Sequence, residues 1–79
     1  MPYILPEDRR QLEKRGALTS GELTYLFTKI AIHYLRNTKV DYQHYNDVIG
    51  ALECCKLELY RRQIALYEDK KRQENGDVV

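Results

Sequence analysis

The sequence predicts an all-α protein: a helical hairpin with one long C-terminal helix, preceded by a short N-terminal helix. Its 79 residues, 43% hydrophobic and 32% charged, suit a single folded, well-solvated domain over 1–79. Apolar residues recur at helical spacing, and capping signals precede the predicted helices. The expected segments are an arm with a short helix (1–18), a second helix (19–37), a long helix (41–75) and a tail (76–79).

The N-terminal segment begins with an apolar stretch, 1–6, that contains two prolines and is expected to be extended. Pro6 suits the first turn of a helix, where its missing N–H group costs nothing. We expect that helix to cover roughly 7–15 and to place Leu12 inward. Gly16 is the expected stop.

The second helix has a strong start signal in "TSGE", where Thr19 and Glu22 form the pattern of a capping box. Beyond it, six apolar residues recur at the spacing of one helix face: Leu23, Leu26, Phe27, Ile30, Tyr34 and Leu35. The helix is expected to end near Asn37.

The third helix has Asp41 as its expected cap, with Val40 and Tyr45 placed as a hydrophobic staple. Within the helix only Gly50 is unfavourable, by about 1 kcal/mol relative to alanine. Asn75-Gly76 is a typical C-terminal stop. The apolar residues expected on its inner face are Tyr45, Val48, Ile49, Leu52, Cys55, Leu59, Tyr60, Ile64 and Tyr67.

The lengths of the two helices predict self-association. At 1.5 Å per residue the third helix is roughly 50 Å long and the second about 25 Å. Joined by the short loop "NTKV", they are expected to form an antiparallel hairpin in which the second helix ends opposite about residue 57. The overhang needs cover for its apolar residues, which are Leu59, Tyr60, Ile64, Leu66 and Tyr67. We therefore expect a homo-oligomer, a dimer or higher; the alternative is a compact three-helix monomer.

Composition and charge exclude several classes of protein. The net charge of +1 argues against bulk nucleic-acid binding by charge alone. No apolar run is long enough for a membrane span, and no basic leader precedes an apolar core, so neither a span nor a signal peptide is expected. The adjacent Cys54 and Cys55 indicate a reduced, cytoplasmic protein with buried or half-buried thiols. No cofactor and no metal ligands are predicted.

The candidate binding surface combines tyrosines with basic residues near the C-terminus: Tyr60, Arg61, Arg62, Tyr67, Lys70 and Lys71. Arginine forks suit phosphate groups, and tyrosine rings can stack on bases. Positions 61–74 hold five basic and three acidic residues, a net charge of +2. These features fit a nucleotide or phosphate pocket at a subunit interface. The alternative is a solvated face held by the pairs Glu58–Arg62 and Glu68–Arg72, whose spacing favours helix stability.

Enzymatic alternatives find weaker support. An all-α metal-dependent nucleotide pyrophosphohydrolase would need carboxylates on a shared face, and the nearest spacings are Glu74 with Asp77 and Glu53 with Glu58. Cysteine–histidine catalysis would need His33 or His44 beside the cysteine pair, together with an orienting acid. We therefore predict no catalytic residues.

The last third of the chain carries a long motif, "NDVIGALECCKLELYRR", followed by "YEDKK" and "ENGDV". Together with "GEL-YL" earlier, it resembles a family of small bacteriophage and prophage proteins that form a domain of unknown function, over about 20–78. Family members often have "VVAPY" where this chain has "QIAL", so Leu66 in place of proline predicts a straighter helix. The resemblance implies a bacterial cytoplasm as the setting.

Combined with the residues, this setting suggests a non-enzymatic binding protein that inhibits a host defence. Such a protein would sequester a nucleotide-like or other anionic ligand, or block a host protein with a helical face. A purely structural or adaptor role is the remaining alternative.

Overall fold

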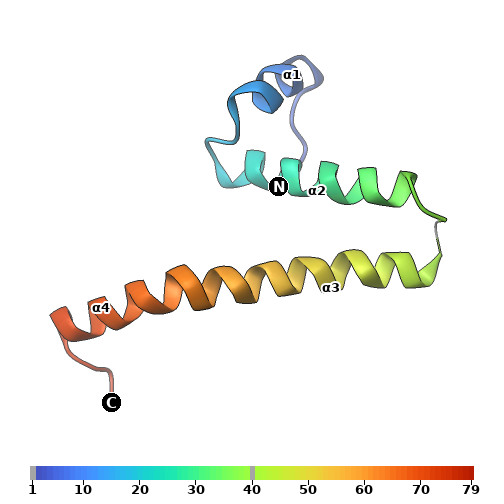
Figure 1. Ribbon diagram of the computed structural model, residues 1–79. Coiled ribbons are helices and arrows are strands. Elements are labelled where there is room, and N and C mark those ends of the chain that lie inside the picture. Colours follow the sequence, from blue (N-terminus) through green and yellow to red (C-terminus); the bar gives the residue numbers. More distant parts are fainter. Residues whose placement is uncertain (1, 40) are drawn as a thin grey trace. The chain divides into compact units, whose positions relative to one another are not determined.

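The computed structural model describes residues 2–39 and 41–79, and in that part of the chain all regular secondary structure is helical (Figure 1). The first two helices are α1 (Pro6–Arg15) and α2 (Ser20–Arg36). They are followed by α3 (Tyr42–Leu59), the π-helical segment η1 (Tyr60–Ile64) and α4 (Ala65–Asn75). The residues at both junctions, Leu59 and Ile64, have helical backbone angles, so these three elements form one continuous helix. The all-helical class and the long C-terminal helix are confirmed.

The residues fall into two compact units, 1–45 and 46–79, and each is described by itself. The first unit holds α1, α2 and the first turn of α3. The second consists of the rest of the long helix and the C-terminal tail.

In the first unit, α1 follows the expectation from the sequence. Pro6 opens the helix, and Leu12 has no exposed surface. Gly16 ends the helix with a φ of 87°, and its N–H group donates a hydrogen bond of 2.8 Å to the carbonyl of Leu12. The arm before the helix is tied to it because Nε of Arg9 donates to the carbonyl of Ile4 at 3.0 Å.

The second buried side chain of the described residues is Tyr25, which is only 6% exposed. Its hydroxyl donates to Oε1 of Glu13 at 3.1 Å, and the guanidinium carbon of Arg9 lies 5.8 Å from its ring centroid. The pattern of the sequence did not single out Tyr25. The six apolar residues that the sequence placed on one face of this helix are exposed or half-buried. The reason is that α1 reaches α2 on the side of Tyr25.

The caps of the two later helices are formed as expected. Oγ1 of Thr19 accepts from the N–H group of Glu22 at 3.2 Å, and Oδ1 of Asp41 accepts from the N–H group of His44 at 3.0 Å. The hydrogen bond from the His44 N–H group lowers the pKa of Asp41. The ring of His44 also lies 6.1 Å from that of Tyr34. Val40, the other half of the expected staple, lies outside the described residues.

The long helix departs from uniform α geometry at η1. The N–H group of Ala65 donates to the carbonyl of Tyr60, five residues back rather than four. The expectation of an unbroken α-helix is therefore wrong in this stretch, because a wider turn accommodates one extra residue. The C-terminal stop is confirmed: Gly76 has a φ of 90°, and its N–H group donates to the carbonyl of Arg72 at 2.9 Å.

The expectation of buried or half-buried thiols is wrong as well. Cys54 and Cys55 are both free and exposed. The whole of the long helix shares this exposure, since α3, η1 and α4 contain no buried residue.

Candidate functional site

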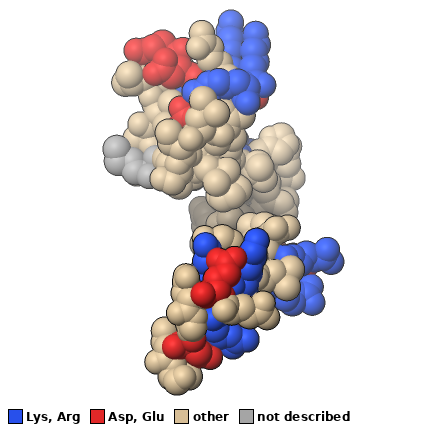
Figure 2. Space-filling model, turned by 90° about the vertical axis from the view of Figure 1, so that its left-hand side faces the viewer, with Lys and Arg blue, Asp and Glu red and all other residues tan. Residues whose placement is uncertain are grey.

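The six candidate binding residues lie on two consecutive elements of the long helix. Three are in η1 and three in α4: Tyr60, Arg61 and Arg62, then Tyr67, Lys70 and Lys71. All six are exposed. Acidic side chains are interspersed among the basic ones of the C-terminal helix, so the surface is mixed rather than uniformly positive (Figure 2).

Two of the cations converge on one acid. Nη2 of Arg61 donates to Oε2 of Glu58 at 2.7 Å, and Nε of Arg62 donates to Oε1 of the same carboxylate. The predicted Glu58–Arg62 pair is thus confirmed, with Arg61 as a second partner. The arginine side chains remain 72% and 71% exposed, and the three residues together carry a net charge of +1.

The two lysines of α4 differ in their contacts. The ammonium group of Lys71 lies 5.7 Å from the ring centroid of Tyr67 and 3.3 Å from Oε2 of Glu74. Lys70 forms no ion pair with any residue in the described ranges. Lys70 is therefore the cation of this surface that is most available to a ligand.

Arg72 is paired with different acids from the one expected. Its Nη2 lies 3.7 Å from Oδ1 of Asp69 and its Nη1 lies 3.9 Å from Oδ2 of Asp77, whereas no pair with Glu68 forms. The turn at Gly76 makes this possible, because it directs the tail back towards the end of α4. Oδ1 of Asp77 in turn accepts from the N–H group of Val78 at 2.7 Å.

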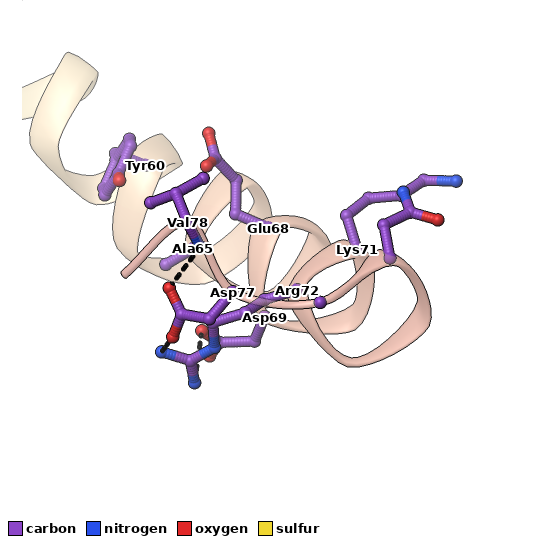
Figure 3. A pocket seen from close by; sticks show the side chains of 10 residues that line it. Tyr60, Ala65, Glu68, Asp69, Lys71, Arg72, Asp77 and Val78 are labelled. Carbon is purple, nitrogen blue, oxygen red and sulfur yellow. Dashed lines mark hydrogen bonds and ion pairs between the residues drawn. The ribbon is translucent and has the colours of Figure 1, made fainter.

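The returning tail and the end of the long helix enclose an open hollow of about 450 Å³ (Figure 3). It is lined by residues from η1, α4 and the tail: Tyr60, Ala65, Glu68, Asp69, Lys71, Arg72, Asn75, Gly76, Asp77 and Val78. Two of the predicted binding residues, Tyr60 and Lys71, are among them, whereas the other four are not. The sequence signal for this hollow was the turn pattern Asn75-Gly76-Asp77, which was interpreted only as a helix stop.

The carboxylates of the enzymatic alternative are engaged elsewhere. Glu53 lies 3.1 Å from Nζ of Lys56, Glu74 pairs with Lys71, and Asp77 pairs with Arg72. Among the described residues, no group of three or more histidine, cysteine, aspartate or glutamate side chains is placed to hold a metal ion. None of these helices is both long and apolar enough to cross a bilayer.

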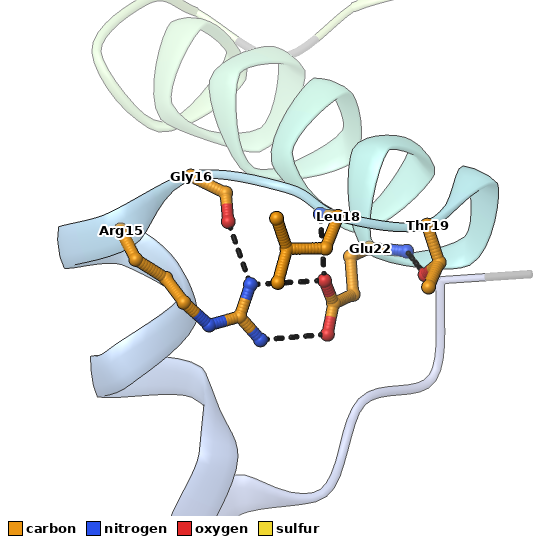
Figure 4. Close-up of polar contacts among 5 residues, drawn as sticks. All are labelled: Arg15, Gly16, Leu18, Thr19 and Glu22. Carbon is orange, nitrogen blue, oxygen red and sulfur yellow. Dashed lines mark hydrogen bonds and ion pairs between the residues drawn. The ribbon is translucent and has the colours of Figure 1, made fainter.

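A polar cluster that the sequence did not reveal joins α1 to α2 (Figure 4). Nη1 and Nη2 of Arg15 donate to Oε1 and Oε2 of Glu22 at 3.1 and 2.9 Å. The N–H group of Leu18 also donates to Oε1, at 2.9 Å. In a standard capping box the donor to this carboxylate would be the N–H group of Thr19. The hydrogen bonds from Arg15 and Leu18 lower the pKa of Glu22 to about 2.

Comparison with known proteins finds one family. The family described as "Domain of unknown function (DUF6899)" matches residues 1–78. No curated protein matches the chain, and no solved structure does.

Proposed function

The chain belongs to the DUF6899 family, and we propose that it is a small non-enzymatic binding protein that acts as a homo-oligomer. Its ligand is a nucleotide-like or other anionic molecule, bound through the cations of η1 and α4. The observation that supports this proposal is that Arg61 and Arg62 share the single carboxylate of Glu58.

Sharing one carboxylate leaves hydrogen-bonding capacity for a ligand. Each guanidinium group carries five N–H donors, and a carboxylate cannot satisfy ten. Since both arginines are about 70% exposed, their ion pairs with Glu58 are worth about 0.2–1 kcal/mol and rearrange at little cost. A phosphate group can therefore displace or extend these pairs, with both arginines as forked donors.

Neighbouring side chains supply the other contacts that a nucleotide-like ligand needs. Tyr60 and Tyr67 are 50% and 62% exposed, so their rings are accessible for stacking on a base. Lys70 adds a positive charge without an internal partner. These residues and the arginines lie within about three turns of one another along the helix.

A second copy is part of the proposal because a single helix has a convex surface. Side chains that diverge from one helix cannot surround a small ligand, whereas two adjacent helices form a groove between them. η1 and α4 contain no buried residue, so their side chains are available to another copy. We further propose that the protein acts in a bacterial cytoplasm as an inhibitor of a host defence, and the resemblance of its C-terminal motif to phage proteins supports this part of the proposal.

A protein ligand is the second candidate, and the observation that favours it is the exposed apolar surface of the long helix. Ile49, Leu59 and Ile64 are 67%, 54% and 45% exposed. Helices of this kind dock into apolar grooves of other proteins. In that case the chain blocks a host protein, and the cations at the rim contribute to the rate of encounter.

Titration with fluorescently labelled mononucleotides, dinucleotides and cyclic nucleotides tests the proposal, with pyrophosphate as the competitor. We expect saturable binding that Arg62→Ala weakens about tenfold, the effect of losing one charge-assisted hydrogen bond. The matched control is Lys29→Ala, which removes an exposed cation from α2 and leaves the affinity unchanged. The nucleotide should be recovered chemically intact. If no nucleotide and no pyrophosphate binds, or if a product is released, the proposal is wrong.

A further inference from the structure

Glu68 differs from the other acids in the C-terminal part of the long helix and the tail. All residues from 48 to 79 are described, and six acidic side chains occur among them. Five of the six lie within ion-pair distance of a lysine or arginine: Glu53, Glu58, Asp69, Glu74 and Asp77. Glu68 forms no ion pair with any residue in the described ranges, and it lines the hollow at the end of the helix. Its negative charge is therefore open to a ligand in the hollow.

The cations of the hollow do not compensate for this charge. Arg72 lies between Asp69 and Asp77, at 3.7 and 3.9 Å, so two carboxylates share one guanidinium group and leave a net charge of −1. The ammonium group of Lys71 is held at 3.3 Å by Glu74, and in Figure 3 it extends away from the other lining side chains. The hollow therefore favours a positively charged ligand over an anion.

Tyr60 adds an aromatic wall to the hollow, on the same side of the helix as Glu68. The two residues are eight positions apart, which in α geometry would set them about 80° apart around the helix. The π-helical turn from Tyr60 to Ala65 takes up one extra residue, and both side chains line the hollow. Tyr60 is 50% exposed, and no cation from the described part of the chain lies over its ring.

The long helix already contains a tyrosine, an acid and a cation in a matching arrangement. The ammonium group of Lys71 lies 5.7 Å from the ring centroid of Tyr67 and 3.3 Å from Oε2 of Glu74. Tyr67 and Glu74 are seven residues apart, which is two turns of an α-helix. Tyr60 and Glu68 are also two turns apart, because η1 takes up the additional residue.

Ala65 stands where the second arrangement lacks its cation. It lies one turn after Tyr60, as Lys71 lies one turn after Tyr67, and its N–H group donates to the carbonyl of Tyr60. The methyl side chain of Ala65 lines the hollow and leaves its volume of about 450 Å³ open. A ligand can therefore supply the ammonium group that the chain itself does not place there.

We propose that the hollow binds a primary ammonium group on an aliphatic chain, as carried by a polyamine or by a lysine side chain. The carboxylate of Glu68 accepts hydrogen bonds from the ammonium group, and the electron-rich face of Tyr60 attracts it. Ala65 and Val78 provide apolar contacts for the aliphatic chain.

This cation site goes beyond the proposed anion site. Arg61, Arg62 and Lys70 do not line the hollow, whereas Tyr60 belongs to both sites. Glu68 separates the two, because the anion site makes no use of its carboxylate.

Nuclear magnetic resonance titration of the full-length protein with putrescine and with N-acetyl-lysine amide tests the proposal. We expect saturable shifts at Ala65, Gly76 and Val78, which line the hollow. Glu68→Gln should weaken amine binding about two- to fivefold, the equivalent of one exposed ion pair. The matched control is Glu7→Gln, which removes an exposed negative charge from α1 and leaves the affinity unchanged.

Tyr60→Leu tests the aromatic wall separately. Leucine keeps the apolar contact and removes the ring, so amine affinity should fall about two- to fivefold, the effect of losing a cation–π contact at an exposed site. An unchanged affinity in this variant would overturn the assignment of Tyr60 to the site.

The outcomes separate this inference from the proposed function. Saturable binding of either amine, weakened by Glu68→Gln alone, supports the site, and the probe that binds more tightly identifies a free polyamine or a lysine side chain as the source. If neither amine binds saturably, or if Glu68→Gln and Glu7→Gln have equal effects, the proposal is wrong. The Glu68→Gln variant should bind nucleotides at least as tightly as the wild type, so either site can fail without the other.

Discussion

Arg15 at the end of α1 and Glu22 in the first turn of α2 face each other through a two-pronged ion pair, with N–O distances of 3.1 and 2.9 Å. The pair spans the sharp connection that follows Gly16. The hydrogen bonds between the two side chains raise the pKa of Arg15 and lower that of Glu22. The junction of α1 and α2 is therefore sensitive to pH.

Glu22→Gln tests this sensitivity. The pKa of Glu22 is lowered from about 4.5 to about 2 in the folded chain, so its ionised form is favoured by folding. The contribution of the ionised Glu22 to the stability of the fold is fully present above pH 4.5 and is lost as the pH falls towards 2. We expect the variant to melt at a lower temperature than the wild type at pH 7, and the difference to shrink between pH 4.5 and 2. Thermal melts across that range measure the difference in melting temperature between variant and wild type. A difference that stays constant with pH would contradict this account.

Leu12 anchors the small core of the first unit. Leu12→Ala should destabilise the fold by about 2–5 kcal/mol, because a completely buried leucine leaves a cavity. Leu18→Ala is the matched control, since Leu18 is 75% exposed and little contact is lost. Urea unfolding monitored by circular dichroism measures both changes. Equal midpoints for the two variants would show that Leu12 does not form a core.

Thr19 is the structural cap of α2. Thr19→Ala removes the oxygen that accepts from the N–H group of Glu22, and about 1 kcal/mol of stability should be lost with it. Thr28→Ala is the control within the same helix. The Thr28 hydroxyl donates to the carbonyl of Thr24 and caps nothing, and alanine has the higher helix propensity. In chemical denaturation the control variant should therefore be more stable than Thr19→Ala, and equal stability of the two would contradict the role of Thr19 as the cap.

Glu58 limits the affinity of the proposed anion site. Glu58→Gln removes the negative charge that Arg61 and Arg62 share, so anion affinity should rise about two- to fivefold, the equivalent of an exposed ion pair. The increase should shrink at high salt because the charges are exposed. Competition between pyrophosphate and a labelled nucleotide measures the change. Weaker binding in this variant would show that the carboxylate itself contributes to the ligand site.

The features that were predictable from the sequence are local ones. Thr19 and Asp41 cap their helices, and Gly16 and Gly76 end theirs, because each effect depends on only a few neighbouring residues. Leu12 was predictable as a core residue because, apart from Pro6, it is the single apolar residue of its short helix.

The features that were missed depend on contacts between segments or on competing backbone geometries. Tyr25 is buried because α1 approaches that side of α2, which hydrophobic periodicity along a single helix does not reveal. The five-residue turn from Tyr60 competes closely with an α turn, so residue type alone does not distinguish the two. The pairing of Arg72 with Asp77 required knowledge of the direction of the tail after Gly76.

Native mass spectrometry of the protein purified from cells, followed by denaturation of the same sample, tests the central claim most directly. The account predicts a multimer that carries additional mass, released on denaturation as an intact nucleotide-like or other anionic compound. A bare monomer would contradict both the homo-oligomer and the anionic ligand.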